Sequence, residues 1–130
     1  MAGTATSINS SLSSSVQLRG AAGLRCLGPV NIGNGNNYRV PDRSVVRVDA
    51  ELGVFLPSAV MVVEIVSPDD ETLAKFGFYF EHAVQEILVV DPASRSVAWF
   101  RRGAVEFVDA PGSEVVTGLD DLAGRLRWPT

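Results

Sequence analysis

The most hydrophobic stretch of the chain lies near its middle, where residues 58–66 (SAVMVVEIV) form an almost continuous apolar, β-branched run. Such a run is typical of a strand that is buried on both faces of a sheet. Residues 86–90 form another run of this kind and predict a further buried strand. The pattern therefore indicates a sheet whose centre is covered on both sides.

The segment between these runs carries the signals of an amphipathic helix. Residues 67–71 (SPDDE) offer capping side chains and acidic groups suited to a first turn. Apolar residues then recur at steps of three and four, which predicts the face that packs on the sheet: Leu73, Phe76, Phe80 and Ala83. Lys75, Tyr79 and His82 share a second face at steps of four and three, so they are candidates to line a site together.

The N-terminal part of the chain is divided between a poorly patterned stretch and a predicted hairpin. Residues 1–22 begin with an uncharged, serine-rich segment and predict a tail or, from the spacing of a few apolar residues, a weak helix. Residues 24–30 and 38–48 predict two strands, and the glycine- and asparagine-rich residues 31–37 predict the turn between them. We therefore expect one domain at residues 23–130.

The C-terminal part predicts a second hairpin and a short helix. An Asp-Pro turn at residues 91–92 precedes strands expected at residues 96–101 and 105–108, and a helix is expected at residues 119–126. The expected order is three strands, a helix, three strands and a helix. This order indicates an α/β or α+β fold with a mixed central sheet flanked by helices.

Composition and charge exclude several classes of protein. The 130 residues suffice for one core, and 46% of them are hydrophobic while 20% are charged, as in ordinary globular proteins. The longest apolar run, residues 59–63, is too short to cross a membrane. One cysteine, Cys26, and the lack of a signal-peptide pattern predict a cytoplasmic protein. The net charge of −4 argues against charge-driven, sequence-independent binding to nucleic acid as the main activity.

Glu64 is the strongest chemical anomaly, because it interrupts the most hydrophobic predicted strand, where an unpaired carboxylate is costly. Glu64 either caps the following helix, pairs with an arginine, or binds a metal ion. Asp42, which follows Pro41 at the predicted second strand, supplies another carboxylate, and two carboxylates suit Mg²⁺. Lys75 is the only lysine beside ten arginines, so it is either a required ammonium group or a solvated surface lysine.

Four ordered segments carry a resemblance to a known family: YRVPD at residues 38–42, VEIVSP at residues 63–68, Lys75 with Tyr79, and ILVVDP at residues 87–92. In this order they resemble the Uma-two family of restriction-endonuclease-like proteins, which are similar to PD-(D/E)xK nucleases. The resemblance runs from about residue 28 to residue 100 and continues weakly into the predicted terminal helix. It implies a restriction-endonuclease-like fold, here with a shortened N-terminal part.

The resemblance also implies a chemistry. Asp42 and Glu64 would bind Mg²⁺ or Mn²⁺ with the backbone carbonyl of Ile65 as a further ligand, and Lys75 would position or activate the attacking water. The implied activity is hydrolysis of DNA phosphodiester bonds; DNA is then the partner, and a homodimer is an assembly left open. Val66 stands where related nucleases carry a lysine two residues after the glutamate. The alternative is therefore a catalytically inactive, truncated family member that acts as an interaction or structural module.

Overall fold

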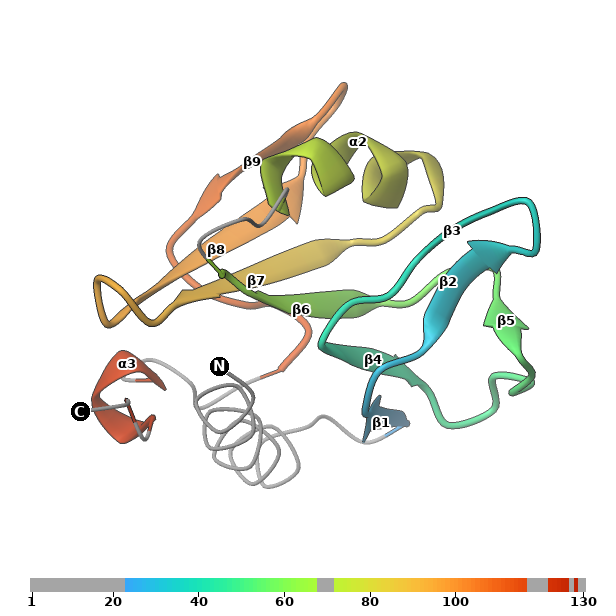
Figure 1. Cartoon of the computed structure of the whole chain (residues 1–130), viewed down its shortest axis with the longest axis horizontal. Helices are drawn as coiled ribbons and strands as arrows, with labels where there is room; N and C mark the ends of the chain where they lie inside the picture. The colour runs from blue at the N-terminus through green and yellow to red at the C-terminus, as the bar shows by residue number, and fades with distance from the viewer. Residues whose placement is uncertain (1–22, 68–71, 117–121, 127, 129–130) are drawn as a thin grey trace.

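The computed structural model describes residues 23–67, 72–116, 122–126 and 128 (Figure 1). The elements within these ranges are β1 (Leu24–Leu27), β2 (Asn31–Asn34), β3 (Asn37–Arg39), β4 (Arg43–Arg47), β5 (Phe55–Leu56), β6 (Met61–Ile65), α2 (Thr72–Glu81), β7 (Glu86–Asp91), β8 (Ser96–Arg102), β9 (Phe107–Ala110) and α3 (Leu122–Arg125). The tail or weak helix predicted at residues 1–22 lies outside the described residues. No helix within the described ranges is long and apolar enough to cross a membrane.

A six-stranded mixed sheet forms the centre of the fold, in the order β1-β4-β6-β7-β8-β9. The two central strands, β6 and β7, are parallel and are connected through α2, whereas the remaining neighbours are antiparallel. These six strands are the six that the hydrophobic pattern predicts. The predicted mixed α+β architecture with a buried centre is therefore confirmed.

A second, three-stranded sheet with the order β3-β2-β5 corrects the predicted N-terminal hairpin. Residues 31–37, expected to form only a turn, contain β2 and the start of β3, which pair around a turn at residues 35–36. The side chain of Asn34 stabilises this turn, because its Oδ1 accepts hydrogen bonds from the backbone N–H groups of Asn36 (2.9 Å) and Asn37 (3.1 Å). The predicted strand at residues 38–48 is divided at Pro41, between β3 and β4.

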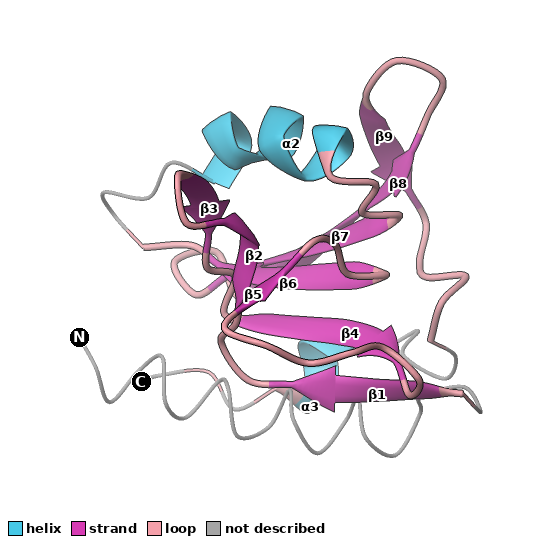
Figure 2. Cartoon of the chain, turned by 90° about the vertical axis from the view of Figure 1, so that its right-hand side faces the viewer, coloured by secondary structure: helices cyan, strands magenta, loops and turns pink. Residues whose placement is uncertain are grey.

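Among the described residues, α2 covers one face of the main sheet and α3 the other, and each face has its own hydrophobic core (Figure 2). Side chains of β6 alternate between the two cores, because successive residues of a strand point to opposite faces. Val62 packs in the core beneath α2, whereas Met61, Val63 and Ile65 pack in the core that contains α3. Glu64 therefore lies on the face that α2 covers.

The prediction that Leu73 belongs to the packing face of α2 is wrong. Leu73 is 76% exposed, although the spacing of apolar residues places it on the sheet. Phe76 and Phe80 are half-buried and pack as expected, with the ring of Phe76 contacting Phe100 at 4.9 Å and the ring of Phe80 contacting Phe107 at 5.6 Å between centroids.

The physical reason lies in the polar group beneath the helix. The side of α2 that is buried against the sheet includes Thr72 and Tyr79, and the Tyr79 side chain is fully buried. With Tyr79 turned toward Glu64, the phenylalanines pack to one side, against β8 and β9. Leu73 then falls at the exposed edge, and Ala83 lies beyond the end of the helix with a positive φ of 61°.

Candidate active site

The side chain of Glu64 is buried beneath α2 and is 1% exposed. The phenol of Tyr79 donates a hydrogen bond of 2.6 Å to Glu64 Oε2, and Lys75 Nζ lies 3.0 Å from Glu64 Oε1. Both partners come from the same face of α2, one helical turn apart. The buried carboxylate is thus compensated by a lysine and a tyrosine, not by a helix cap or an arginine.

Lys75 and Tyr79 differ in their exposure to solvent. The Lys75 side chain is 25% exposed, so its ammonium group lies between the buried carboxylate and water, whereas Tyr79 has no exposed surface. His82, which the sequence groups with them, does not join the site. Its Nδ1 lies 2.9 Å from the backbone oxygen of Phe78, and its ring stacks on the Phe78 ring.

Asp42 lies immediately before β4 and next to the end of β6. Its backbone N–H donates to the Val63 carbonyl (2.9 Å), and its Oδ2 accepts a hydrogen bond from the Ile65 N–H (2.7 Å). These two contacts are with the residues on either side of Glu64. The structure therefore brings Asp42, Glu64 and Lys75 together at the carboxyl end of β6.

The electrostatics of this cluster follow from burial. Loss of water around Glu64 raises the pKa of its carboxyl group, and the nearby charge of Asp42 adds to the increase, although Tyr79 and Lys75 oppose it. Burial and the negative Glu64 also raise the pKa of the Tyr79 phenol. Tyr79 is therefore a permanent hydrogen-bond donor to Glu64.

The donor set fits a magnesium ion. No group of three or more His, Cys, Asp or Glu side chains gathers within the described ranges. The carboxylates at this place are Glu64 and Asp42, which is held by the residue after Glu64 and whose charge acts on it. Mg²⁺ binds proteins through one or two carboxylates and retains several of its waters. A second positive charge beside a buried carboxylate of raised pKa would also relieve the cost of ionising it.

Comparison with known proteins assigns the family. The model of the Uma-two family (Uma2), described as putative restriction endonuclease, matches residues 3–128. The chain belongs to the Uma-two family. A crystal structure of a putative nuclease from Anabaena variabilis superposes with a TM-score of 0.71 and 21% identity, covering 96% of this chain and 83% of that one. No curated protein matches the chain.

The fold predicted from the resemblance, restriction-endonuclease-like, is thereby confirmed. In this Uma-two chain Val66 is half-buried, and its backbone N–H donates to the Val90 carbonyl. Its side chain supplies no charge to the site. The ammonium group beside Glu64 comes from Lys75 on α2 instead.

Two residues near the centre of this Uma-two site were not among the predicted catalytic or metal-binding residues. Tyr79 was a candidate to line a site with Lys75 and His82 but was given no role, although a buried carboxylate needs a donor and the four-residue spacing from Lys75 was the available signal. Arg39, in the YRVPD segment, lies near enough for its positive charge to act on the Tyr79 phenol. Nothing in the sequence alone shows that proximity.

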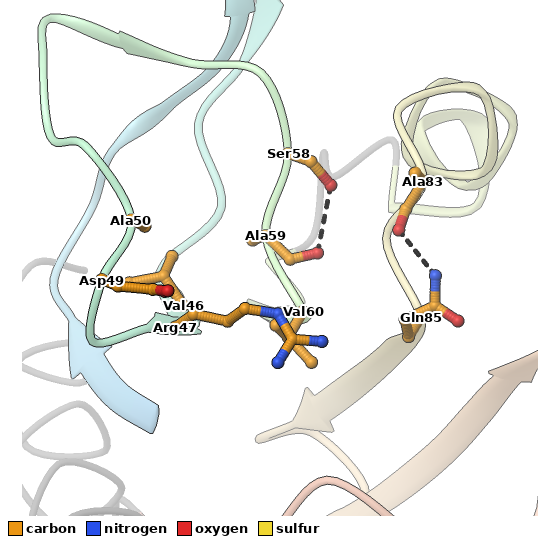
Figure 3. A pocket seen from close by; sticks show the side chains of 9 residues that line it. All are labelled: Val46, Arg47, Asp49, Ala50, Ser58, Ala59, Val60, Ala83 and Gln85. Atoms are coloured by element: carbon orange, nitrogen blue, oxygen red, sulfur yellow. Dashed lines mark hydrogen bonds between the residues drawn. The ribbon is translucent and has the colours of Figure 1, made fainter. Parts of the chain in front are cut away.

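An open pocket of about 310 Å³ lies at the other end of the main sheet (Figure 3). Its lining comes from the end of β4, the residues before β6 and those after α2, and includes Val46, Arg47, Ser58 and Gln85. Glu64 is near the opposite end of β6. The pocket is therefore separate from the carboxylate site.

Replacing Glu64 by glutamine is expected to stabilise the metal-free protein at neutral pH, by an amount on the order of 1 kcal/mol. The raised pKa means that burial disfavours the ionised carboxylate by more than Lys75 and Tyr79 favour it, and glutamine keeps the shape without the charge. Since the pKa of Glu64 is raised on folding, the parent gains stability as the pH falls through that raised pKa toward the ordinary value of a glutamate, and the difference between the proteins should shrink. Thermal melts in EDTA across pH test this. Glu81→Gln, an exposed change on α2, is the control, and a Glu64→Gln protein that melts below the parent at neutral pH contradicts the prediction.

Proposed function

We propose that the chain is a cytoplasmic, metal-dependent nuclease that hydrolyses phosphodiester bonds of DNA through a PD-(D/E)xK-type site. Asp42, Glu64 and the backbone carbonyl of Ile65 would hold Mg²⁺ or Mn²⁺. The observation that carries the proposal is the 3.0 Å contact between Lys75 and a buried glutamate that has a second carboxylate beside it. The Uma-two family membership supports the same reaction class.

Each protein group has a role that follows from its surroundings. Tyr79 donates to Glu64 Oε2 and fixes the rotation of the carboxylate, so Glu64 has a defined orientation before any ligand binds. Asp42 is held by the Ile65 N–H, which fixes the second carboxylate relative to the same strand. The site is therefore preorganised by bonds within the chain.

Lys75 is the group with access to a water nucleophile. Its ammonium carries three donors, of which one reaches Glu64, and its partial exposure leaves the others directed toward solvent. It can orient a water and offset negative charge that develops on the phosphate. When bound by Asp42, Glu64 and the Ile65 carbonyl, Mg²⁺ would supply the remaining chemistry, a lower pKa for an attacking water and neutralisation of phosphate charge.

The parent protein is expected to melt at a higher temperature in Mg²⁺ or Mn²⁺ than in EDTA. A ligand present at about 100 times its dissociation constant adds about 2.7 kcal/mol to the free energy of unfolding. The same samples are incubated with double- and single-stranded DNA to measure cleavage. Ca²⁺ and a Glu64→Gln protein serve as comparisons for ion type and for the site.

A melting temperature that neither Mg²⁺ nor Mn²⁺ changes, together with no cleavage of either DNA substrate, would contradict the proposal. The chain would then be a non-catalytic relative that keeps the fold as an interaction or structural module. Stabilisation by Mg²⁺ without cleavage would support the metal site but contradict the proposal that DNA is the substrate.

A further inference from the structure

Arg39 is a half-buried residue at the end of β3. Within the described ranges it forms no ion pair with a carboxylate. Its guanidinium lies over the ring of Phe78, with Cζ 4.7 Å from the centroid. Nη1 donates to Asn37 Oδ1 and to the Tyr38 carbonyl, both at 2.9 Å. The guanidinium is thus held by hydrogen bonds at Nη1 and by the Phe78 ring against one of its flat faces.

The opposite edge of the guanidinium is available to a ligand. Nε and Nη2 donate to no group in the described part of the chain, and together they form the fork with which arginine binds a phosphate or carboxylate bidentately. Stacking on Phe78 leaves this edge usable, because the ring occupies the flat face of the group. A charged donor is therefore fixed in place, and no group among the described residues occupies its binding edge.

The β2–β3 hairpin that carries Arg39 is anchored against α2. Gly33 has a φ of +125°, and a Cβ there would lie 2.4 Å from the Asn37 oxygen and 3.0 Å from the Phe78 ring. Only glycine permits this close approach. The hairpin thereby rests on Phe78, the residue before Tyr79. Figure 1 and Figure 2 both show β3 beside α2.

We propose that Arg39 is a positioning residue that binds a phosphate of the DNA backbone next to the Glu64 centre, and this inference rests on the proposed nuclease function. Without a bound metal ion the site carries two carboxylates and one ammonium group, so in this state it repels a polyanion unless further positive charge lies near. Arg39 supplies that charge from a second element. DNA held at Arg39 would place its neighbouring phosphate toward Lys75.

The salt dependence of DNA binding tests this role. Fluorescence anisotropy with a labelled duplex in EDTA gives the slope of log K against log salt concentration, which changes by about 0.9 for each phosphate contact. Arg39→Ala and Arg39→Gln should each reduce the slope by about that amount and weaken binding at low salt about 10- to 100-fold. Arg39→Lys keeps the charge and should keep the slope.

The matched control is Arg47→Ala. Arg47 is the last residue of β4, at the end away from Asp42, and it lines the separate pocket. This variant should retain the parent slope. A purely structural role for Arg39 would lower the melting temperature and the affinity of Arg39→Ala with the slope unchanged, and this result would overturn the inference. Arg39→Gln keeps most of the packing, so it serves if Arg39→Ala fails to fold.

The outcomes separate this inference from the proposed function. A parent that binds DNA with an Arg39-dependent slope but cuts nothing in Mg²⁺ supports the phosphate contact and rejects the nuclease. A parent that cuts DNA while all Arg39 variants keep its slope rejects the phosphate contact alone. No detectable DNA binding by the parent at low salt rejects the contact as well.

Discussion

Metal-dependent cleavage of DNA is expected to fall by roughly 10²- to 10⁴-fold in each of the proteins Asp42→Asn, Glu64→Gln and Lys75→Ala. Each change removes several kcal/mol of transition-state stabilisation, and a tenfold loss corresponds to about 1.4 kcal/mol. Because the three side chains act around one centre, the double variants should lose little more than the single ones. Initial cleavage rates at saturating Mg²⁺ give these ratios.

Glu86→Gln is the matched control for the loss of a buried carboxylate. Glu86 is 3% exposed on the neighbouring strand β7, where its oxygens accept hydrogen bonds from Ser113 and the Glu114 backbone, in contacts outside the Glu64 cluster. This change alters stability but should leave the cleavage rate of the folded protein near that of the parent. Equal losses in Glu86→Gln and Glu64→Gln would mean that the effect is structural.

Phe76→Ala is expected to lower the free energy of unfolding by about 3 kcal/mol, which is the lower end for a phenylalanine truncation because the side chain is half-buried. The ring contacts Phe100 and Phe107 edge to face, so its removal breaks two aromatic contacts. Urea unfolding monitored by circular dichroism measures the change, and the slope of the transition should stay constant.

Leu73→Ala provides the comparison within the same helix. Leu73 is an apolar residue three positions earlier but is largely exposed, so its truncation should change stability by less than about 0.5 kcal/mol. Equal losses for Leu73→Ala and Phe76→Ala would show that the helix packs through the face predicted from the apolar spacing alone.

The main sheet could be predicted because long hydrophobic runs identify buried strands whatever their partners. The run at residues 58–66 contains β6, the run at residues 86–90 lies within β7, and the antiparallel pairing of β1 with β4 follows from the predicted first two strands. The second sheet could not be predicted, because β2, β3 and β5 have only two to four residues each. Strands this short carry no usable alternation, and their polar, glycine-rich composition predicts a turn.

The candidate site could likewise be predicted only in part, because some of its features depend on local sequence and others on how distant segments meet. Glu64 could be singled out because a charge in an apolar strand needs compensation, and Lys75 because it is the only lysine. That Leu73 faces solvent depends on Tyr79 turning toward Glu64, which spacing within the helix does not reveal. The place of Arg39 beside Phe78 likewise depends on how the β2–β3 hairpin folds back onto α2.

The contact between Lys75 and Glu64 joins a helix to a sheet, and this makes the site sensitive to mutations far from it. Glu64 lies in β6 and Asp42 is bonded to the same strand, but the ammonium and phenol groups are held in place by the packing of α2. A screen of random variants for lost activity should therefore recover aromatic residues of the helix interface alongside the charged ones. Activity would be a more sensitive reporter of helix docking than secondary-structure content, since a small shift of α2 breaks both contacts while every strand stays paired.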